Sequence, residues 1–153
     1  MTTWLVAILL TAAATATASG GSAGGRASYL GGTHPSVPSG ARGFVEAVDE
    51  RYFVFYARKE SVRIPYERIN LLEYGQRVSR RYALAVLISP VFVLAKKRHH
   101  YLTLGYQDDN GRQQALVFQV DKSHIRMVLV TLEARTGLKI EYQDEEARKA
   151  GKG

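Results

Sequence analysis

One stretch constrains this chain more than any other: residues 82–95 carry no formal charge and have basic residues on both sides. No acidic residue lies between the first and the last of six flanking cations, which are Arg77, Arg80, Arg81, Lys96, Lys97 and Arg98. The formal net charge of the 153-residue chain is +7, so these cations account for nearly all of it. A local basic border around an apolar run indicates a partner that is apolar in one layer and anionic in the next, such as a bilayer surface.

The apolar run is too short to cross a bilayer as one helix. Its 14 residues would span roughly 21 Å at a rise of about 1.5 Å each, whereas a hydrocarbon core is about 30 Å thick. Ser89 and Pro90 interrupt a helix or a strand, which leaves two apolar limbs, 83–88 and 91–95, that can form a hairpin. Either both limbs are buried in the protein core, or the hairpin projects into an apolar layer or a partner's groove.

A projecting hairpin would place apolar side chains in the acyl layer while the flanking cations neutralise lipid head groups. The candidate contact residues are Arg80, Arg81, Leu84, Leu87, Val91, Phe92, Leu94, Lys96, Lys97 and Arg98. The same hairpin could instead dock into a protein partner or a second copy of the chain. The protein would then be an interaction scaffold or an oligomer subunit with no lipid role.

The first 18 residues have the pattern of an export signal. Residues 4–10 are apolar, and the small residues that follow end in Ala16-Thr17-Ala18, a small-x-small sequence suited to signal cleavage. No Lys or Arg precedes the apolar part, so an uncleaved anchor is the alternative, although it is shorter than the roughly 20 residues of a spanning helix. We expect cleavage after Ala18 and a place in the periplasm or cell envelope.

The remaining composition indicates one small domain between two segments without a core. The chain is 46% hydrophobic and 23% charged, as is ordinary for a globular protein. Residues 19–43 are rich in Gly, Ser, Ala and Pro, and we expect a flexible linker there. Residues 143–153 are expected to form a charged tail with weak helical tendency and no core. The domain is then expected over residues 44–142, with 82–95 as an apolar insertion.

Alternation of apolar and polar residues predicts several short antiparallel strands in this domain. They are expected at 44–48, 51–57, 62–64, 69–78, 101–107 and 113–120. Asn110-Gly111 favours a hairpin turn, and Gly75 is expected to mark a bulge or a bend. Asp121 is expected to cap a helix that ends before Gly137. Its apolar face consists of Ile125, Val128, Leu129 and Leu132.

This order of strands followed by one amphipathic helix resembles that of pleckstrin-homology (PH) domains. The passage RIPYERINLLEYG, residues 63–75, is similar to part of bacterial PH and GRAM-type domains. The resemblance implies an α+β, mainly β fold, in which the strands form a small barrel or curled sheet and the C-terminal helix caps it. It also implies a binding module, often for lipids or proteins. The lipid-contacting positions of that family have no matching motif in this chain.

The sequence offers little for catalysis or metal binding. The chain has no cysteine, which excludes thiol catalysis and thiolate zinc sites, and it has no Gly-x-Ser-x-Gly or phosphate-binding glycine motif. His99 and His100 are adjacent, so on a strand they point to opposite faces, and we expect both to be solvated. Asp108 and Asp109 resemble the start of a calcium loop, but a hairpin turn explains them. We expect a non-enzymatic protein without cofactor or metal, and export argues against nucleic acid as partner.

Overall fold

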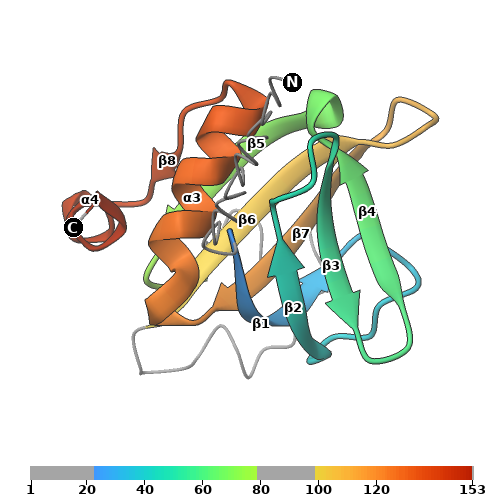
Figure 1. Cartoon of the computed structure of the whole chain (residues 1–153), viewed down its shortest axis with the longest axis horizontal. Coiled ribbons are helices and arrows are strands. Elements are labelled where there is room, and N and C mark those ends of the chain that lie inside the picture. Colours follow the sequence, from blue (N-terminus) through green and yellow to red (C-terminus); the bar gives the residue numbers. More distant parts are fainter. Residues whose placement is uncertain (1–22, 79–98, 153) are drawn as a thin grey trace, which may run out of the picture.

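One strongly curled sheet dominates the computed structural model, which describes residues 23–78 and 99–152 (Figure 1). The first four strands are β1 (Gly24–Gly32), β2 (Arg42–Glu46), β3 (Tyr52–Ala57) and β4 (Ser61–Pro65). The short 3-10 helix η1 (Tyr66–Arg68) leads to β5 (Ile69–Gly75), β6 (His100–Gln107) and β7 (Gln113–Val120). Antiparallel pairing of β1 with β7 joins both groups in the order β4-β3-β2-β1-β7-β6-β5. The mainly β architecture and the predicted strands of the domain are thereby confirmed.

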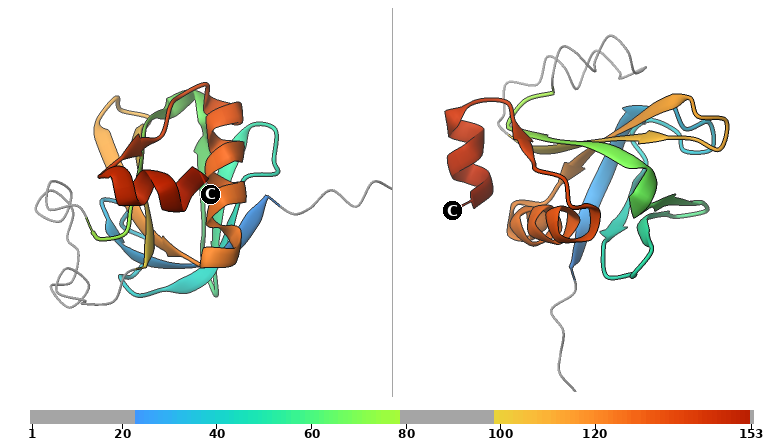
Figure 2. Two further views of the ribbon diagram at one scale, coloured as in Figure 1. Left: turned by 90° about the vertical axis from the view of Figure 1, so that its left-hand side faces the viewer. Right: turned by 90° about the horizontal axis from the view of Figure 1, so that it is seen from above.

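Helix α3 (Lys122–Thr136) lies against the inner side of this curled sheet (Figure 2). Its predicted apolar face is buried and belongs to the main core. Gly137 ends the helix with a left-handed φ of 72°, and its N–H donates to the carbonyl of Glu133 at 2.9 Å. Asp121 occupies the capping position, although its side chain makes no capping hydrogen bond within the described structure. The expected C-terminal helix is therefore confirmed, together with the residue that ends it.

The core is centred on aromatic side chains that different strands place together. Tyr29, Phe53, Phe55 and Phe118 have ring centroids 5.0 to 6.3 Å apart with tilted planes. Such tilted contacts add to the stabilisation that the buried apolar area provides. Because Tyr29 is on β1 and Phe118 on β7, this cluster holds together the two halves of the sheet.

The prediction of a flexible linker over residues 19–43 is wrong for the part that the structure describes. Residues 24–32 form β1, which is hydrogen-bonded on one edge to β2 and on the other to β7. Tyr29 and Leu30 are almost completely buried. The glycines permit close packing: a Cβ on Gly25 would lie 2.3 Å from the Cβ of His124 on α3. Few large side chains are needed, because pairing on both edges orders the strand.

The prediction of a charged tail without a core contact is also wrong. After the two-residue strand β8 (Glu141–Tyr142), which runs parallel to β5, the chain forms α4 (Glu145–Lys152). Asp144 begins this helix by accepting a hydrogen bond from the N–H of Ala147 at 2.6 Å. Ala147 is fully buried and belongs to the main core. Three small residues, Ala147, Ala150 and Gly151, thus anchor a helix whose other residues are charged.

Gly75 does not form the expected bulge. It pairs regularly with Tyr101, and the register shift in β5 lies instead between Ile69 and Leu71. A Cβ on Gly75 would lie 1.8 Å from the side-chain oxygen of Gln143. The glycine is needed because the segment leading to α4 crosses closely over it.

Candidate functional site

The candidate contact residues from Arg80 to Arg98 all lie outside the described residues, as does the N-terminal signal. The arrangement of the apolar limbs, buried or projecting, is likewise not described. Val78 is buried in a small cluster with Leu30 and Tyr101, and the Nδ1 atom of His99 lies 3.3 Å from the amide nitrogen of Gln119. The described residues on either side of 79–98, Val78 and His99, are therefore each in contact with the folded domain.

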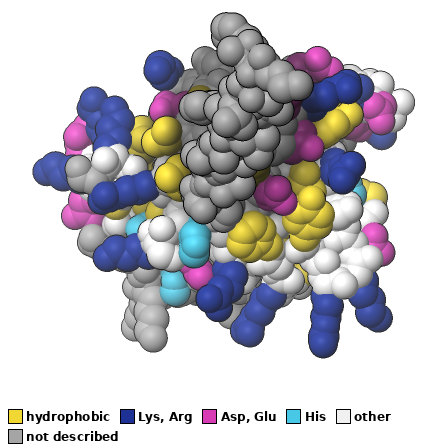
Figure 3. Space-filling view, in the orientation of Figure 1, with side chains coloured by type: hydrophobic (Ala, Val, Ile, Leu, Met, Phe, Trp, Pro, Cys, Tyr) yellow, Lys and Arg dark blue, Asp and Glu magenta, His cyan; other side chains and the backbone are white. Residues whose placement is uncertain are grey.

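A cleft of about 1000 Å³ has Gln76 and His100 among its lining residues, which are close to Val78 and His99 in the sequence. Three parts of the fold form it: the end of β5 with the start of β6, the first turns of α3, and α4. The residues that line it are Gln76, His100, Asp121, Lys122, Ser123, Arg126 and Ala150. In Figure 3 two His side chains and several Lys or Arg side chains lie at the lower left, where α3 begins in Figure 1, and further Lys and Arg side chains lie along the lower edge below β2 to β4. We define these lining residues as the α3 cleft.

The α3 cleft carries a positive charge. Lys122 and Arg126 are exposed, and among the described residues that line the cleft Asp121 is the only acid. Arg26 on β1 lies 4.0 Å from the Asp121 carboxylate, and both side chains are largely exposed. An exposed pair at this distance contributes little stability, but it offsets the charge of the acid. The remaining cations are then available to an anion.

The ring of His100 is held in the cleft wall by Tyr74. Its Nδ1 atom lies 2.5 Å from the hydroxyl oxygen of Tyr74, and the two rings stack at 15°. Burial, with help from Tyr142, raises the pKa of Tyr74 to about 12, so its hydroxyl keeps its proton at neutral pH. In the tautomer in which this hydroxyl donates, Nδ1 accepts and the neutral His100 ring carries its proton on Nε2; in the other tautomer Nδ1–H donates to the hydroxyl oxygen.

The charge state of His100 follows from its surroundings. Burial lowers the pKa of His100, and the positive charge of Lys122 and the neighbouring His99 lower it further. The ring is therefore neutral at pH 7, and its one N–H group can donate a hydrogen bond without being charged. The prediction that His100 is solvated is wrong, because the ring is half-buried against Tyr74.

The segment after α3 holds Tyr74 in place. Tyr74 is fully buried, and the ring of Tyr142 packs edge-on against it at 76°. The buried carboxylate of Glu73 accepts a hydrogen bond from the side-chain amide of Gln143 at 2.9 Å. Gly151 on α4 lies so close to Tyr142 that a Cβ would be 2.7 Å from its ring. The wall of the cleft is thus supported from the protein interior by β8 and α4.

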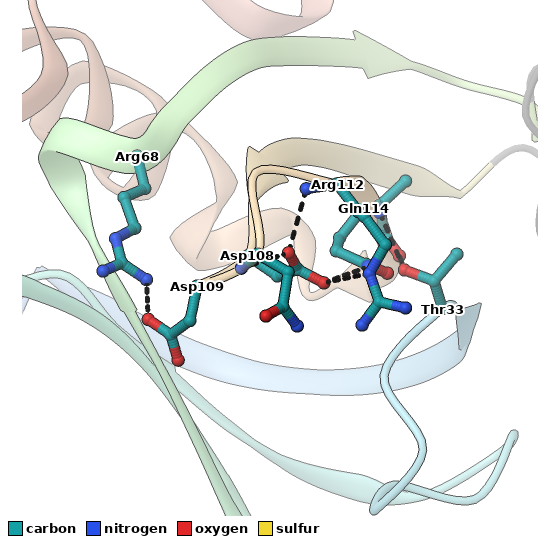
Figure 4. A network of polar contacts seen from close by, with 8 residues as sticks. Thr33, Arg68, Asp108, Asp109, Arg112 and Gln114 are labelled. Carbon is teal, nitrogen blue, oxygen red and sulfur yellow. Dashed lines mark hydrogen bonds and ion pairs between the residues drawn. The ribbon is translucent and has the colours of Figure 1, made fainter.

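The acidic pair at the β6–β7 turn has a structural role (Figure 4). The Asp108 carboxylate accepts hydrogen bonds from the backbone N–H groups of Asn110 and Arg112, each at 2.9 Å, and from the side chain of Gln114 at 2.8 Å. These donors, above all the Arg112 N–H, lower the pKa of Asp108. Asp109 pairs with Arg68 of η1. The predicted hairpin turn is confirmed, and its acids bind their own turn.

Within residues 23–78 and 99–152, no three His, Asp or Glu side chains are grouped closely enough to hold a metal ion. The helices in the same ranges are too short or too polar to cross a bilayer. Neither a comparison with protein-family models nor a search among curated proteins finds a match for this chain.

Sequence reasoning missed the α3 cleft, although part of it leaves a trace in the sequence. Lys122 and Arg126 are four residues apart, which places them on one helical face. Tyr74 lies opposite Leu102, so His100 is its diagonal neighbour on the same face of the sheet. That relationship depends on the register of two strands separated by more than 20 residues. A pattern among residues close together in the sequence does not indicate the register of two such distant strands.

Proposed function

We propose that this chain is a non-enzymatic binding module that attaches peripherally to an anionic membrane surface. The observation that carries the proposal is the charge of the α3 cleft, whose lining residues Gln76 and His100 are close in the sequence to residues 79–98. Lys122 and Arg126 stand there with Arg26, while Asp121 is the one acid lining the cleft in the described structure. Their positive charges extend the basic border that the sequence places around the apolar run.

We also infer that the fold is PH-like and that the protein is exported. Seven antiparallel strands in the order β4-β3-β2-β1-β7-β6-β5, followed by α3 against the inner side of the sheet, support the first inference. The apolar and small residues of positions 1–18 support the second. An exported protein would meet the lipid surface in the periplasm or cell envelope.

The expected strength of attachment follows from the number of cations. Each Lys or Arg near an anionic surface contributes about 1 kcal/mol, and this contribution falls within a Debye length of about 10 Å at 0.1 M salt. The cleft and the basic border together would give firm binding at low salt that weakens as salt is added. The apolar hairpin would add a contribution that salt does not remove.

The experiment is co-sedimentation of the full-length chain with phosphatidylglycerol-containing vesicles at low and high salt. We expect binding at low salt that fades at high salt. Lys122→Glu, and more strongly Lys122→Glu with Arg126→Glu, should weaken it. Lys139→Glu is the matched control, because Lys139 is exposed beyond the opposite end of α3 and makes the same charge change. Absence of binding at every salt concentration would refute the proposal.

One observation favours a second candidate, a protein-interaction scaffold or oligomer subunit. Met127 and Val130 on α3 are 51% and 61% exposed, an apolar surface next to Arg126 that a protein could cover. The size of the full-length chain in solution without lipid tests this candidate. An oligomer that Phe92→Asp or Met127→Asp dissociates would support it. A monomer that still binds vesicles would leave membrane attachment as the better explanation.

A further inference from the structure

We propose that two copies of this chain associate through the outward face of α3, with the two helices antiparallel across a twofold axis. The inference goes beyond membrane attachment and does not depend on it. It gives the oligomer considered above one definite surface and one partner, a second copy of the chain. Three properties of α3 carry it: an uncharged outward stripe, a groove beside the stripe, and flanking charges that complement those of a second copy.

The outward face of α3 is a stripe of uncharged side chains. Met127 and Val130 are 51% and 61% exposed, more than any other large hydrophobic residue in the described ranges. They are three residues apart on a helix and are therefore neighbours on one face. Ser123 comes four residues before Met127 and Ala134 four residues after Val130, and both are exposed. We define Ser123, Met127, Val130 and Ala134 as the α3 stripe.

The α3 stripe has the spacing of a helix that packs against another helix. Its members follow one another at intervals of four, three and four residues, as the two apolar positions of a coiled-coil heptad do. The opposite face of α3 is the one buried in the main core. A helix at a protein surface normally has polar and charged residues on its outward face. An outward face with this spacing and composition indicates that a second helix covers it.

A groove of about 340 Å³ lies beside the stripe, between α3 and α4, which are next to each other in the fold (Figure 2). Met127, Leu129 and Val130 line it from α3, and Tyr142 and Gly151 line it from the C-terminal segment. Helices pack by placing the side-chain ridge of one into the groove beside a ridge of the other. The stripe of a second copy therefore meets an apolar recess beside the stripe of the first.

The charged residues beside the stripe select an antiparallel pair. Arg126 precedes Met127 and Glu133 precedes Ala134, so the two charges flank the stripe on one side, about two helical turns apart. If Met127 of each copy packs on Val130 of the other in an antiparallel pair, Arg126 of each copy comes next to Glu133 of the other. Charges at such flanking positions set the direction in which two helices pair. In a parallel pair, Arg126 would be level with Arg126 of the other copy.

Both flanking residues can make this contact without losing another. Arg126 makes no ion pair with a described residue. The Oε1 atom of Glu133 accepts a hydrogen bond from the N–H of Ile140 at 3.0 Å, which restrains the side chain and leaves the second carboxylate oxygen for a partner. A twofold axis produces the Arg126–Glu133 contact twice in each dimer. These exposed pairs contribute mainly to the direction of pairing, and the stripe contributes most of the affinity.

The interface should be weak because it consists of one helix from each copy. The stripe extends over 12 residues, or roughly 18 Å of helix at about 1.5 Å per residue. Complexes that bury less than about 1,200 Å² in total are mostly weak and transient. We therefore expect a dimer that forms at high protein concentration and dissociates on dilution.

Sedimentation velocity of the full-length chain over a range of concentrations tests the surface. Met127→Asp and Val130→Asp should each raise the dissociation constant of the dimer at least about tenfold, because a carboxylate would be buried in the apolar contact. Val48→Asp is the matched control, because Val48 is 47% exposed between β2 and β3, and it should change the constant by less than about twofold. A dimer that both α3 variants leave intact would overturn the inference.

Charge reversal tests the antiparallel direction. Arg126→Glu and Glu133→Arg should each weaken association about fivefold or more, because each places like charges next to each other twice in the dimer. An equimolar mixture of the two variants should associate again, since one copy then has two acids and the other two cations at these positions. A mixture that associates no better than either variant alone would overturn the antiparallel pair.

Glu133→Gln controls for the hydrogen bond to Ile140, which Glu133→Arg removes. The glutamine keeps an acceptor oxygen but not the charge, so it should weaken association while thermal unfolding stays nearly unchanged. Circular dichroism and thermal unfolding establish that the other variants fold. Association as strong in Glu133→Gln as in the unchanged chain would contradict the role of this charge.

Vesicle binding separates this inference from the proposed function. Lys122→Glu should weaken binding to anionic vesicles and leave the dimer intact, because Lys122 lies outside the α3 stripe. A dimer that Met127→Asp dissociates, in a chain that binds no vesicles, would uphold the inference and refute membrane attachment. A chain that binds vesicles but stays monomeric at every concentration would do the reverse.

Discussion

The hydroxyl oxygen of Tyr74 lies 2.5 Å from Nδ1 of His100, and this contact joins the buried core to the wall of the α3 cleft. Tyr74 is near the end of β5 and His100 is the first residue of β6. The contact therefore spans the two strands between which residues 79–98 lie in the sequence.

Tyr74→Phe removes that hydrogen bond and keeps the buried ring. We expect the free energy of unfolding to fall by about 1 kcal/mol, the usual net contribution of such a bond. Urea unfolding measures the change. Tyr56→Phe is the control, because Tyr56 is 40% exposed and its hydroxyl should contribute little. Equal losses of unfolding free energy in the two variants would show that the contact with His100 contributes no more to stability than an exposed hydroxyl does.

The lowered pKa of His100 makes stability depend on pH. The unfolded histidine titrates near pH 6.5, above the folded value, so between the two values the unfolded chain binds more protons. The stabilisation is therefore complete above about pH 6.5 and decreases as the pH falls toward the folded pKa. Burial lowers the pKa of His34 as well, so both residues contribute in the same direction.

Thermal unfolding between pH 5 and pH 8 checks this dependence. His100→Gln should flatten the profile in part, and the combination with His34→Gln should flatten it further. A profile that His100→Gln leaves unchanged would contradict the assignment.

The β6–β7 turn should depend much more on Asp108 than on Asp109. Asp108→Ala removes the acceptor for two backbone N–H groups and two side chains of the same turn, whereas Asp109→Ala removes one exposed ion pair with Arg68. We expect the urea midpoint to fall clearly in the first variant and hardly in the second. The reverse order would mean that the pair with Arg68, and not the turn, holds this end of the sheet.

Ala147→Asp tests whether α4 belongs to the core. A carboxylate at this fully buried position lacks a partner, and we expect a loss of at least about 2 kcal/mol or detachment of the helix. Ala134→Asp, at an exposed position of α3, is the matched control and should cost less than about 1 kcal/mol. Proteolysis would show a detached helix as cleavage after Tyr142. Similar stabilities of the two variants would restore the interpretation of a loose tail.

Local chemistry made the central elements predictable. The β6–β7 hairpin follows from Asn110-Gly111 between two alternating runs, and α3 follows from apolar residues at helical spacing and from Gly137 at its end. β1 and the core contact of α4 were missed because their order depends on neighbours and not on their own composition. β1 has a partner on each edge, and α4 is anchored by Ala147.

The α3 cleft was likewise only partly predictable from the local sequence. The sequence contains the helical spacing of Lys122 and Arg126, but not the fact that His100 and Gln76 line the same cleft. That juxtaposition requires the curl of the sheet, which brings the β5 and β6 ends toward the start of α3. Contacts between residues so far apart in the chain follow from the packing of whole elements.

By itself, the sequence determined the strand periods, the turn at Asn110-Gly111, the amphipathic helix and the concentration of charge around residues 82–95, because each depends on residues close together in the chain. Only the tertiary structure decided that β1 joins the two halves of the sheet, that α4 supports Tyr74, and that Lys122, Arg126 and His100 share one cleft. The physical reason is that strand register and core packing are fixed by contacts between distant segments, whose free energy no local pattern records.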